Sequence, residues 1–386
     1  MFDLDTIVFP TDVSYRWIVD SLHGKNKRWD ELNKKYDITS AVAEPISGAG
    51  FLSNVLRVKF FFSGKEQVFS AILKVPTMAQ IGKFKEEEEF NAFEESLLCF
   101  HNQEIEFYTS FARHCDVIYF PKMYGYIKSD GSKRIHGRIL AEDVGHLGVL
   151  PDVLKGLNLK MCEEVIKTLA KFHAFTCCFL TTDLILRMQQ LNDKQCEYKV
   201  REYLFELDPF FEEHREEILQ ISEAHQWPVA NAHFKFGVPP MMAHGDCWAN
   251  NMFFEKNVDG SCGEKLFTLF DWQVSKIGTG LCDLSRFLAT SASYEVIEEH
   301  LEHLLKLYYK TMEESMNKKG RKVPYDYEKC KAMFRYEFPN EFLFCALVLP
   351  LLVNKTDDEK IRKGVLRRMK AAFFYARDCA KEIGTL

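Results

Sequence analysis

Features that assign a chain to a specialised class are scarce in this sequence. Its 12 cysteines stand singly or as the neighbours Cys177-Cys178, without a Cys-x-x-Cys. This spacing excludes a short disulfide scaffold and makes a zinc site unexpected, and it favours reduced thiols in the cytoplasm. The net charge of −6 provides no general basic excess, so we do not expect nucleic acid to be the main partner.

Long apolar runs are missing too. The longest, residues 342–353, is too short to cross a bilayer and contains Pro350, so we interpret it as a buried core helix broken near its end. No membrane span is expected. Residues 1–5 are acidic, whereas a secretory signal begins with positive charge followed by an apolar stretch. We therefore expect a cytoplasmic protein.

The chain has 386 residues, of which 47% are hydrophobic and 27% charged. This length and composition are sufficient for two lobes, each with its own hydrophobic core. Runs of strand-forming residues separated by turn residues predict strands early in the chain, and apolar residues at helical spacing predict helices both before and after residue 152. The expected strands cover residues 54–62, 68–75, 117–126 and 135–140, with short strands around a loop within residues 243–270. The expected helices include residues 13–22, 93–108, 161–179 and 295–312. We predict a β-rich first domain, residues 1–142, and a helical second domain, residues 143–386.

The most informative segment is residues 244–251, HGDCWANN, followed by the acidic turn at residues 270–272, FDW. Asp246 is our candidate for the general base that takes up the proton of an attacking hydroxyl. Asn251 and Asp271 supply oxygens suited to Mg²⁺. Phosphoryl transfer from a nucleotide requires this combination of groups, because positioning and charge neutralisation account for most of its catalysis.

A glycine turn at residues 46–53 precedes the first hairpin. Gly48 and Gly50 lie between two strands, so a dinucleotide-binding turn, which joins a strand to a helix, does not fit. The turn either offers backbone N–H groups and the Ser53 hydroxyl to phosphates or is an ordinary entry to a hairpin.

Lys74 lies on the strand after this turn and can reach the α- and β-phosphates of a nucleotide if a carboxylate holds it. Glu104 on the following helix is the candidate carboxylate, and Glu106 is the rival. A lysine in isolation is more often a solvated surface residue. The order of turn, lysine and glutamate favours the functional interpretation.

Six further positions have open interpretations. Asp283 is either a first-turn acid of a helix or a buried carboxylate that supports the loop at residues 244–251. We interpret His244 as a packing residue of that loop and His173 as a hydrogen-bonded core histidine. Aromatic residues are considered as apolar walls of an acceptor site, although such residues are more often core: Trp248, Trp272 and Tyr325.

Taken together, these motifs resemble the aminoglycoside and choline kinase superfamily, through residues 244–251, 270–272 and TLAKFHA at 168–174. Further segments narrow the resemblance to the ecdysteroid-kinase-like branch, also called CHK kinase-like: SGAGFLS at 47–53, EIEFY at 104–108, LAEDV at 140–144 and WANNM at 248–252. The resemblance covers roughly residues 44–292.

The resemblance implies an α+β, bilobal, protein-kinase-like fold that binds ATP and Mg²⁺. It implies that Lys74 pairs with Glu104 and that backbone groups of Glu142 and Val144 meet adenine. The expected activity is phosphorylation of a hydroxyl on a small, lipophilic or steroid-like metabolite. Asp271-Trp272-Gln273 replaces the Asp-Phe-Gly of protein kinases, which argues against a protein substrate. Two rivals stand beside this hypothesis, namely a catalytically silent binding protein of the same fold and a choline- or aminoglycoside-type kinase.

Overall fold

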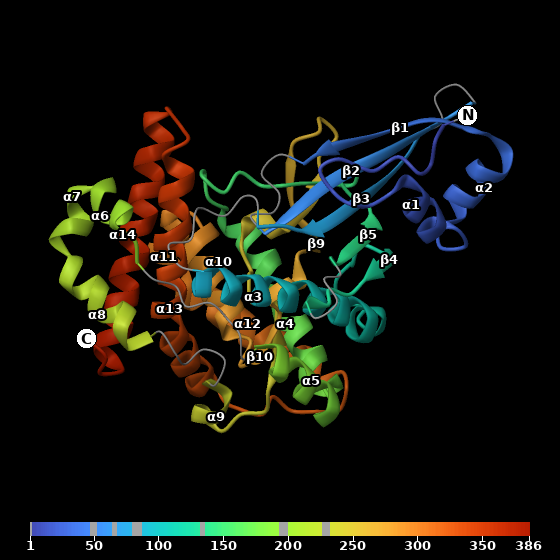
Figure 1. Ribbon diagram of the computed structural model, residues 1–386. Coiled ribbons are helices and arrows are strands. Elements are labelled where there is room, and N and C mark those ends of the chain that lie inside the picture. Colours follow the sequence, from blue (N-terminus) through green and yellow to red (C-terminus); the bar gives the residue numbers. More distant parts are fainter. Residues whose placement is uncertain are drawn as a thin grey trace. The chain divides into compact units, whose positions relative to one another are not determined.

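The computed structural model describes residues 2–46, 52–63, 68–78, 87–131, 136–192, 200–225 and 232–386. Contacts within the chain divide it into two compact units. The first comprises Met1–Arg113 and Phe120–His146, and the second comprises His114–Tyr119 and Leu147–Leu386. The first is β-rich and the second mainly helical (Figure 1), so the α+β class predicted from the sequence is confirmed. The functional division at residues 142 and 143 stays a prediction.

The first unit is built on one antiparallel sheet whose strand order is β1-β2-β3-β5-β4. The predicted hairpin is its centre. Helices precede and follow the hairpin in the chain. The elements are α1 (Tyr15–Leu22), α2 (Lys27–Lys35), β1 (Ile38–Pro45), β2 (Ser53–Phe62), β3 (Val68–Pro76), α3 (Glu87–Glu106), β4 (Met123–Ile127) and β5 (Arg138–Glu142).

Alternation along β3 decides which side chains enter the core of this unit. Phe69, Leu73 and the other odd-numbered residues of the strand are buried among residues of α1 and α2, where Trp29 packs edge-on against Phe60 and Phe69. Because side chains alternate between the two faces of a strand, the even-numbered Lys74 points to the opposite face. There it meets α3, so the period of two places this lysine away from the apolar core.

The second unit surrounds two short antiparallel sheets with helices. One sheet has the strand order β6-β8-β9 and the other pairs β7 with β10. The elements of this unit are β6 (Gly148–Val149), α4 (Leu159–Phe179), α5 (Thr182–Asn192), α6 (Glu202–Leu207), α7 (Pro209–Glu213), α8 (Arg215–His225), α9 (Ala232–Phe236), β7 (Met241–Ala243), β8 (Met252–Lys256), β9 (Cys262–Leu269), β10 (Lys276–Gly278), α10 (Leu281–Ser291), α11 (Tyr294–Glu299), α12 (Leu301–Asn317), α13 (Tyr327–Val353) and α14 (Glu359–Glu382).

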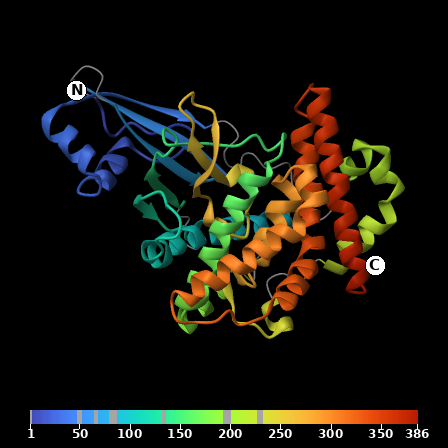
Figure 2. The same cartoon turned by 180° about the vertical axis from the view of Figure 1, so that it is seen from behind.

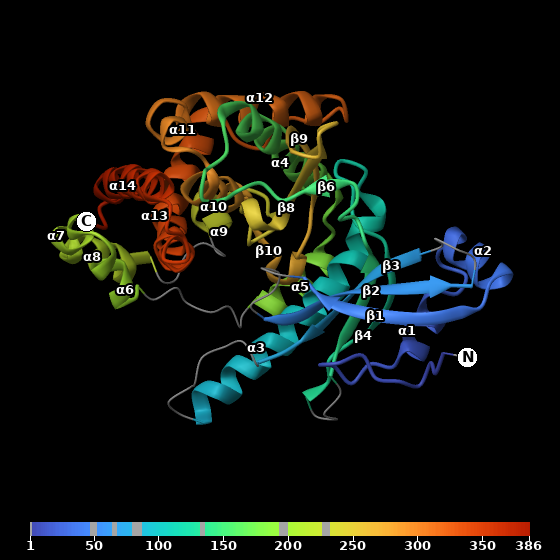
Figure 3. The ribbon, with the colours of Figure 1, turned by 90° about the horizontal axis from the view of Figure 1, so that it is seen from above.

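Helix α10 is the centre of this unit, because every one of its residues is buried. It packs along α13, which in turn packs along α14, while α4 and α12 form a second helix pair. Figure 2 shows α4 and α12 side by side, and Figure 3 shows α13 next to α14. A helix buried on all sides can present polar side chains only to fixed partners, and α10 does so toward the loop after β7.

Three sequence predictions require correction. The strand expected at residues 117–126 is confined to Met123–Ile127. The helix expected at residues 295–312 is two helices, α11 and α12, which meet at His300. Residues 342–353 do not form a broken helix, because α13 continues through Pro339 and Pro350 to Val353. Packing of α13 between α10 and α14 outweighs the local cost of the prolines.

Among the described residues, α13 is the one helix long and apolar enough to cross a membrane by length and composition, and 67% of its most apolar window is buried inside the protein. It also carries the buried acids Glu337 and Glu341, which bond Thr279 and Arg286. These contacts are those of a core helix.

Candidate functional site

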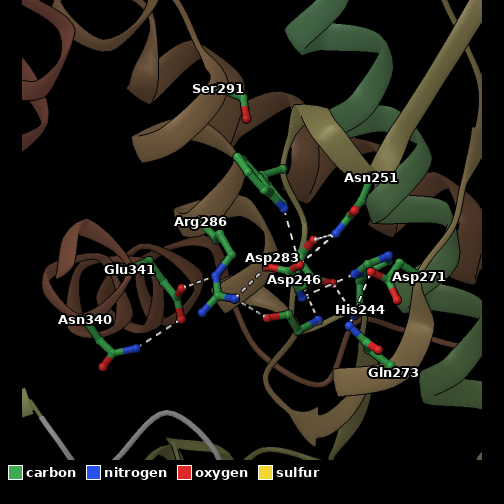
Figure 4. A network of polar contacts seen from close by, with 12 residues as sticks. His244, Asp246, Asn251, Asp271, Gln273, Asp283, Arg286, Ser291, Asn340 and Glu341 are labelled. Carbon is green, nitrogen blue, oxygen red and sulfur yellow. Dashed lines mark hydrogen bonds and ion pairs between the residues drawn. The ribbon is translucent and has the colours of Figure 1, made fainter. Parts of the chain in front are cut away.

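The loop between β7 and β8 carries His244, Asp246 and Asn251 of the polar network in Figure 4. It is shaped by a glycine and a tight turn. Gly245 has φ +81°, and a Cβ at this position would collide with the carbonyl oxygen of Val274. Residues other than glycine rarely tolerate this conformation, so the loop depends on it. The chain then makes a 3-10 turn, Ala249–Asn251, in which the Asn251 amide donates to the Trp248 carbonyl at 2.9 Å. The Ala249 amide donates to Ser291 Oγ on α10 at 2.9 Å.

Strand pairing brings the two sequence motifs to one place. Met252 opens β8 and pairs with Leu269 at the end of β9. The Phe270 amide therefore donates to the Asn251 carbonyl at 3.1 Å, and Asp271 follows directly. The His244 ring adds a second link, since its Nε2 donates to the Phe270 carbonyl at 2.9 Å while its Nδ1 accepts from the Asp246 amide at 3.2 Å. His244 is thus a loop-packing residue, and Asp246, Asn251 and Asp271 lie at one end of the β8–β9 ribbon.

Both oxygens of the Asp246 carboxylate are held by neighbouring donors. Oδ2 accepts from Asn251 Nδ2 at 2.8 Å and from Trp248 Nε1 at 3.2 Å. Oδ1 accepts from Arg286 Nη1 at 3.2 Å. The Asp246 side chain keeps 21% of its surface exposed. The carboxylate is therefore fixed in orientation and still reachable from solvent.

Asp271 has an unusual backbone. Its φ of 66° and ψ of 60° make it the one residue other than glycine with positive φ in the described part of the chain. Left-handed backbone costs an L-residue roughly 1–2 kcal/mol, less for Asp and Asn, and such strain gathers at functional sites. Gln273 Nε2 donates to Asp271 Oδ2 at 3.3 Å. This conformation turns the chain at Asp271, between the end of β9 and the 3-10 turn Trp272–Val274.

Asp283, in the first turn of α10, anchors the loop between β7 and β8 through hydrogen bonds to its backbone. Oδ2 accepts from the His244 amide at 2.7 Å and Oδ1 from the Gly245 amide at 2.9 Å. His173 Nε2 donates to Oδ2 at 3.2 Å, and its Nδ1 meets the Tyr308 hydroxyl at 3.0 Å. Burial by itself would raise the pKa of Asp283, but the hydrogen bond and charge of His173, the charge of His244 and the hydrogen bond from the Gly245 amide together outweigh it and lower the pKa below 3.8. Asp283 is the supporting carboxylate of the two interpretations, and His173 is a bonded core histidine.

Sequence reasoning missed Arg286 and Glu341. Arg286 donates to the Gly245 carbonyl and to Asp246, and also to Glu341 on α13. The signal was present in part, because Arg286 follows Asp283 by three residues and therefore shares its helix face. Glu341 gave no signal, since it lies 55 residues further along the chain.

In the first unit, Lys74 Nζ and Glu104 Oε2 are 2.5 Å apart, with 13% and 6% of the side chains exposed. Glu106, the rival partner, bonds Ser110 and Lys128 instead. Next to the pair, burial lowers the pKa of His101 to about 4; its hydrogen bond to the Ile127 carbonyl opposes the shift, and the Lys74 charge adds to it. The lysine is therefore held by a carboxylate and not solvated.

The segment after β5 is pinned by Asp143. Its carboxylate accepts from Arg57 Nε at 2.7 Å and Nη2 at 3.2 Å, and from the Gly145 amide at 3.1 Å. The Glu142 amide is used inside the sheet, where it donates to the Lys122 carbonyl at 2.9 Å. By contrast, no hydrogen bond within the described residues involves the backbone of Val144. Of the two residues predicted to meet adenine, Glu142 therefore has its amide engaged within the sheet, and both predictions stand.

The remaining positions predicted from the sequence are the glycine turn, Ser53 and the aromatic residues. Gly48 and Gly50 lie outside the described residues. Ser53 opens β2 and is buried, with 3% of its surface exposed. Trp272 is fully buried against His244 and Phe172. Of the two interpretations, core residue fits the burial of Trp272 and also that of Tyr325, whose hydroxyl lies on the Met312 sulfur. Trp248 is buried to the same extent as Tyr325, with 6% of its surface exposed.

Comparison with known proteins places the chain in a family. Residues 65–375 match the model of the DUF1679 family, described as "Uncharacterized oxidoreductase dhs-27", and the chain belongs to this family. A Caenorhabditis elegans protein with that same name is 22% identical over 385 residues, which cover 94% of this chain and 45% of that protein. The chain thus spans less than half the length of this curated relative.

Similar solved structures include small-molecule kinases. A choline kinase from Cryptosporidium parvum is 14% identical over 96% of this chain and 97% of its own, with a TM-score of 0.48. A putative aminoglycoside phosphotransferase from Ralstonia eutropha is 13% identical, covering 89% and 93%, with a TM-score of 0.44. The Plasmodium vivax ethanolamine kinase is 11% identical, covering 96% and 93%, with a TM-score of 0.42. TM-scores below 0.5 do not establish a common function.

Proposed function

We propose that this protein is an ATP- and Mg²⁺-dependent phosphotransferase of the ecdysteroid-kinase-like type, acting on a hydroxyl of a small, lipophilic or steroid-like metabolite. The observation that carries the proposal is the gathering of Asp246, Asn251 and Asp271 at one end of the β8–β9 ribbon through the backbone bond between Phe270 and Asn251. These are the oxygen donors that phosphoryl transfer requires, and Asp246 is already held in one orientation.

The donor set suits Mg²⁺. Asn251 uses its Nδ2 on the Asp246 carbonyl and carboxylate, so its Oδ1, which no described residue occupies, is left as an acceptor. No group of three or more His, Cys, Asp or Glu in the described residues forms a metal cage by itself. Mg²⁺ commonly takes one or two protein oxygens and completes its shell with water and phosphate. Asn251 and Asp271 would hold the ion, and it would neutralise charge on the phosphates.

In the proposed reaction the acceptor oxygen forms a bond to the γ-phosphorus, the bond from that phosphorus to the β–γ bridging oxygen breaks, and ADP leaves. The hydroxyl proton passes to Asp246. Oδ2 already accepts two hydrogen bonds and Oδ1 only one, so Oδ1 is the oxygen we assign to the acceptor hydroxyl. Lys74, oriented by Glu104, is assigned to the phosphates, and the backbone groups of Glu142 and Val144 are assigned to adenine.

The surroundings of Asp246 support an uncharged acceptor. Arg286, 2% exposed, places a positive charge on the Asp246 carboxylate and so compensates it. Trp248 packs edge-on against Phe344, with ring centres 5.7 Å apart. A choline- or aminoglycoside-type acceptor is cationic and would be matched by uncompensated carboxylates. This contrast favours the lipophilic alcohol over that rival.

An oxidoreductase function is named for the curated relative, but the described residues do not support it for this chain. A dinucleotide-binding fold is built on parallel strands with a glycine turn leading into a helix. Every pairing between the strands of the described sheets is antiparallel. The relative's name refers to a protein of which this chain covers 45%.

The test is a search for metabolites that gain a phosphate when the pure protein and MgATP are added to a cell extract, read by mass spectrometry. Asp246→Asn should lower kcat by roughly 10²–10⁴-fold while nucleotide binding persists, since general-base catalysis is worth about that much. Asp271→Ala should abolish Mg²⁺-dependent nucleotide binding, measured by calorimetry. The matched control is Asp357→Asn, an exposed acid without a hydrogen bond or ion pair in the described residues.

Three outcomes would contradict the proposal in whole or in part. Wild-type turnover in Asp246→Asn would remove Asp246 from the role of base. Nucleotide binding without transfer to any metabolite would establish the silent binding protein, and absence of nucleotide binding would exclude both.

A further inference from the structure

Arg286, which bonds the proposed base Asp246, is almost completely buried. Its side chain is 2% exposed, and it lies over the Phe344 ring with the guanidinium carbon 4.1 Å from the ring centre. Nη1 donates to the Gly245 carbonyl at 2.5 Å and to Asp246 Oδ1 at 3.2 Å. Nε donates to Glu341 Oε2 at 2.5 Å. Figure 4 shows the guanidinium between Glu341 and Asp246.

A buried guanidinium is costly to desolvate unless it is paired, so the arrangement needs a physical reason. Glu341 is 0% exposed and sits on α13, where it compensates the arginine charge. Asn340 Nδ2 donates to the other oxygen of Glu341, Oε1, at 3.1 Å. Since Glu341 already balances the charge, the contacts to Gly245 and Asp246 are not needed for neutrality. They fix geometry.

We propose that Arg286 is a positioning residue that holds the Asp246 carboxylate for reaction, with Glu341 and Phe344 of α13 as its mount; the inference rests on the proposed phosphotransfer. The planar guanidinium reaches a backbone carbonyl, the Asp246 carboxylate and Glu341 in fixed directions at once. Together with Asn251 and Trp248 on Oδ2, it leaves the Asp246 side chain one orientation.

Loss of Arg286 should affect the chemical step more than the binding of nucleotide. The contacts described for Arg286 are to the Gly245 carbonyl, Asp246, Glu341 and the Phe344 ring, and none of these is a proposed nucleotide or metal ligand, so its loss should lower kcat far more than nucleotide affinity. A catalytic group misplaced by about 1 Å can cost on the order of 10²-fold in rate. Lysine has a single ammonium on a flexible stem, so it cannot make the contacts to Asp246 and Glu341 in the same directions.

The first experiment separates kcat from KM. Arg286→Met should lower kcat about 100-fold with KM for ATP within about threefold of wild type, and Arg286→Lys should recover only part of the loss. Arg368→Met is the matched control, because Arg368 is equally buried, at 1% exposed, and bonds the Val153 carbonyl away from the loop. It should keep wild-type kcat. In an Asp246→Asn background, Arg286→Met should cause no further loss, whereas an unrelated structural defect would add to it.

A second measurement does not depend on activity. Hydrogen–deuterium exchange of a peptide covering residues 244–252 should be at least about tenfold faster in Arg286→Met than in wild type or Arg368→Met. Unchanged exchange of this peptide, or unchanged kcat in an active protein, would overturn the inference. If wild type transfers phosphate to nothing, the proposed function fails, and the exchange experiment still decides whether Arg286 holds the loop.

Discussion

Replacing Asp283 by asparagine tests how the loop at residues 244–251 is held. Three donors face the two carboxylate oxygens: the His244 amide, the Gly245 amide and His173 Nε2. Asparagine has one carbonyl oxygen. Placed on the side of Oδ2, this oxygen serves His244 and His173, and the NH₂ group then faces the Gly245 amide. Placed on the side of Oδ1, it serves Gly245 alone, so at least one donor is always opposed by another.

The magnitude follows from this count. The change removes at least one hydrogen bond to a charged group, worth about 1.5–3 kcal/mol, and leaves a buried donor unsatisfied at about 1–3 kcal/mol. Asp283 is 1% exposed, so solvent cannot replace the lost partner. We expect Asp283→Asn to lower the free energy of unfolding of the second unit by about 3 kcal/mol, or Tm by about 6–12 °C for a unit of this size.

The assay is urea unfolding at neutral pH followed by tryptophan fluorescence, with Asp326→Asn as the control. Asp326 caps α13 through the Lys329 amide at 2.8 Å, and asparagine caps a helix about equally well, so this variant should lose almost nothing. The folded-state pKa of Asp283 is depressed, so its contribution is present above pH 3.8 and is lost as pH falls further. The gap between Asp283→Asn and wild type should shrink there. Equal stability of the two Asn variants at neutral pH would refute the anchoring argument.

Two further predictions concern the same core. Gly245→Ala should unfold or severely destabilise the protein, because its Cβ meets the Val274 carbonyl, whereas Gly260→Ala, with φ +83° and nothing within 4 Å, should cost only about 1 kcal/mol of backbone strain; similar urea midpoints would contradict this. Burial raises the pKa of Glu337 to about 8 against the Thr279 hydrogen bond. The folded state then binds this proton more tightly than the unfolded state, so wild-type stability should fall relative to Glu337→Gln by up to about 1.4 kcal/mol per pH unit between about pH 5 and 8. Parallel pH profiles of stability would show that Glu337 is not protonated in the fold.

Elements whose structure depends on local sequence could be predicted from local sequence patterns. The hairpin of β2 and β3 was predicted from two strand-forming runs with turn residues between them, and α4 from its apolar stripe. The continuity of α13 through two prolines could not be predicted, because it depends on packing against α10 and α14, which are remote or later in the chain. Likewise the roles of Lys74, Asp246, Asn251 and Asp271 stay predictions, while their contacts are now described.

The support of the site was less predictable than its reactive groups for a physical reason. The candidate groups Asp246, Asn251 and Asp271 lie in or beside short loops, where spacing alone constrains them. Their anchors come from elements that meet only after folding: His173 and Asp283 are 110 residues apart, and Arg286 and Glu341 are 55 apart. What the sequence does carry is the three-residue step from Asp283 to Arg286 on α10, which turns both side chains to one face. Asp283 accepts from the loop amides, and Arg286 donates to its carbonyl and carboxylate. A buried helix that offers an acceptor and then a donor, one turn apart, can hold a neighbouring loop by both kinds of backbone group. That pairing is a pattern to look for after any loop of this kind.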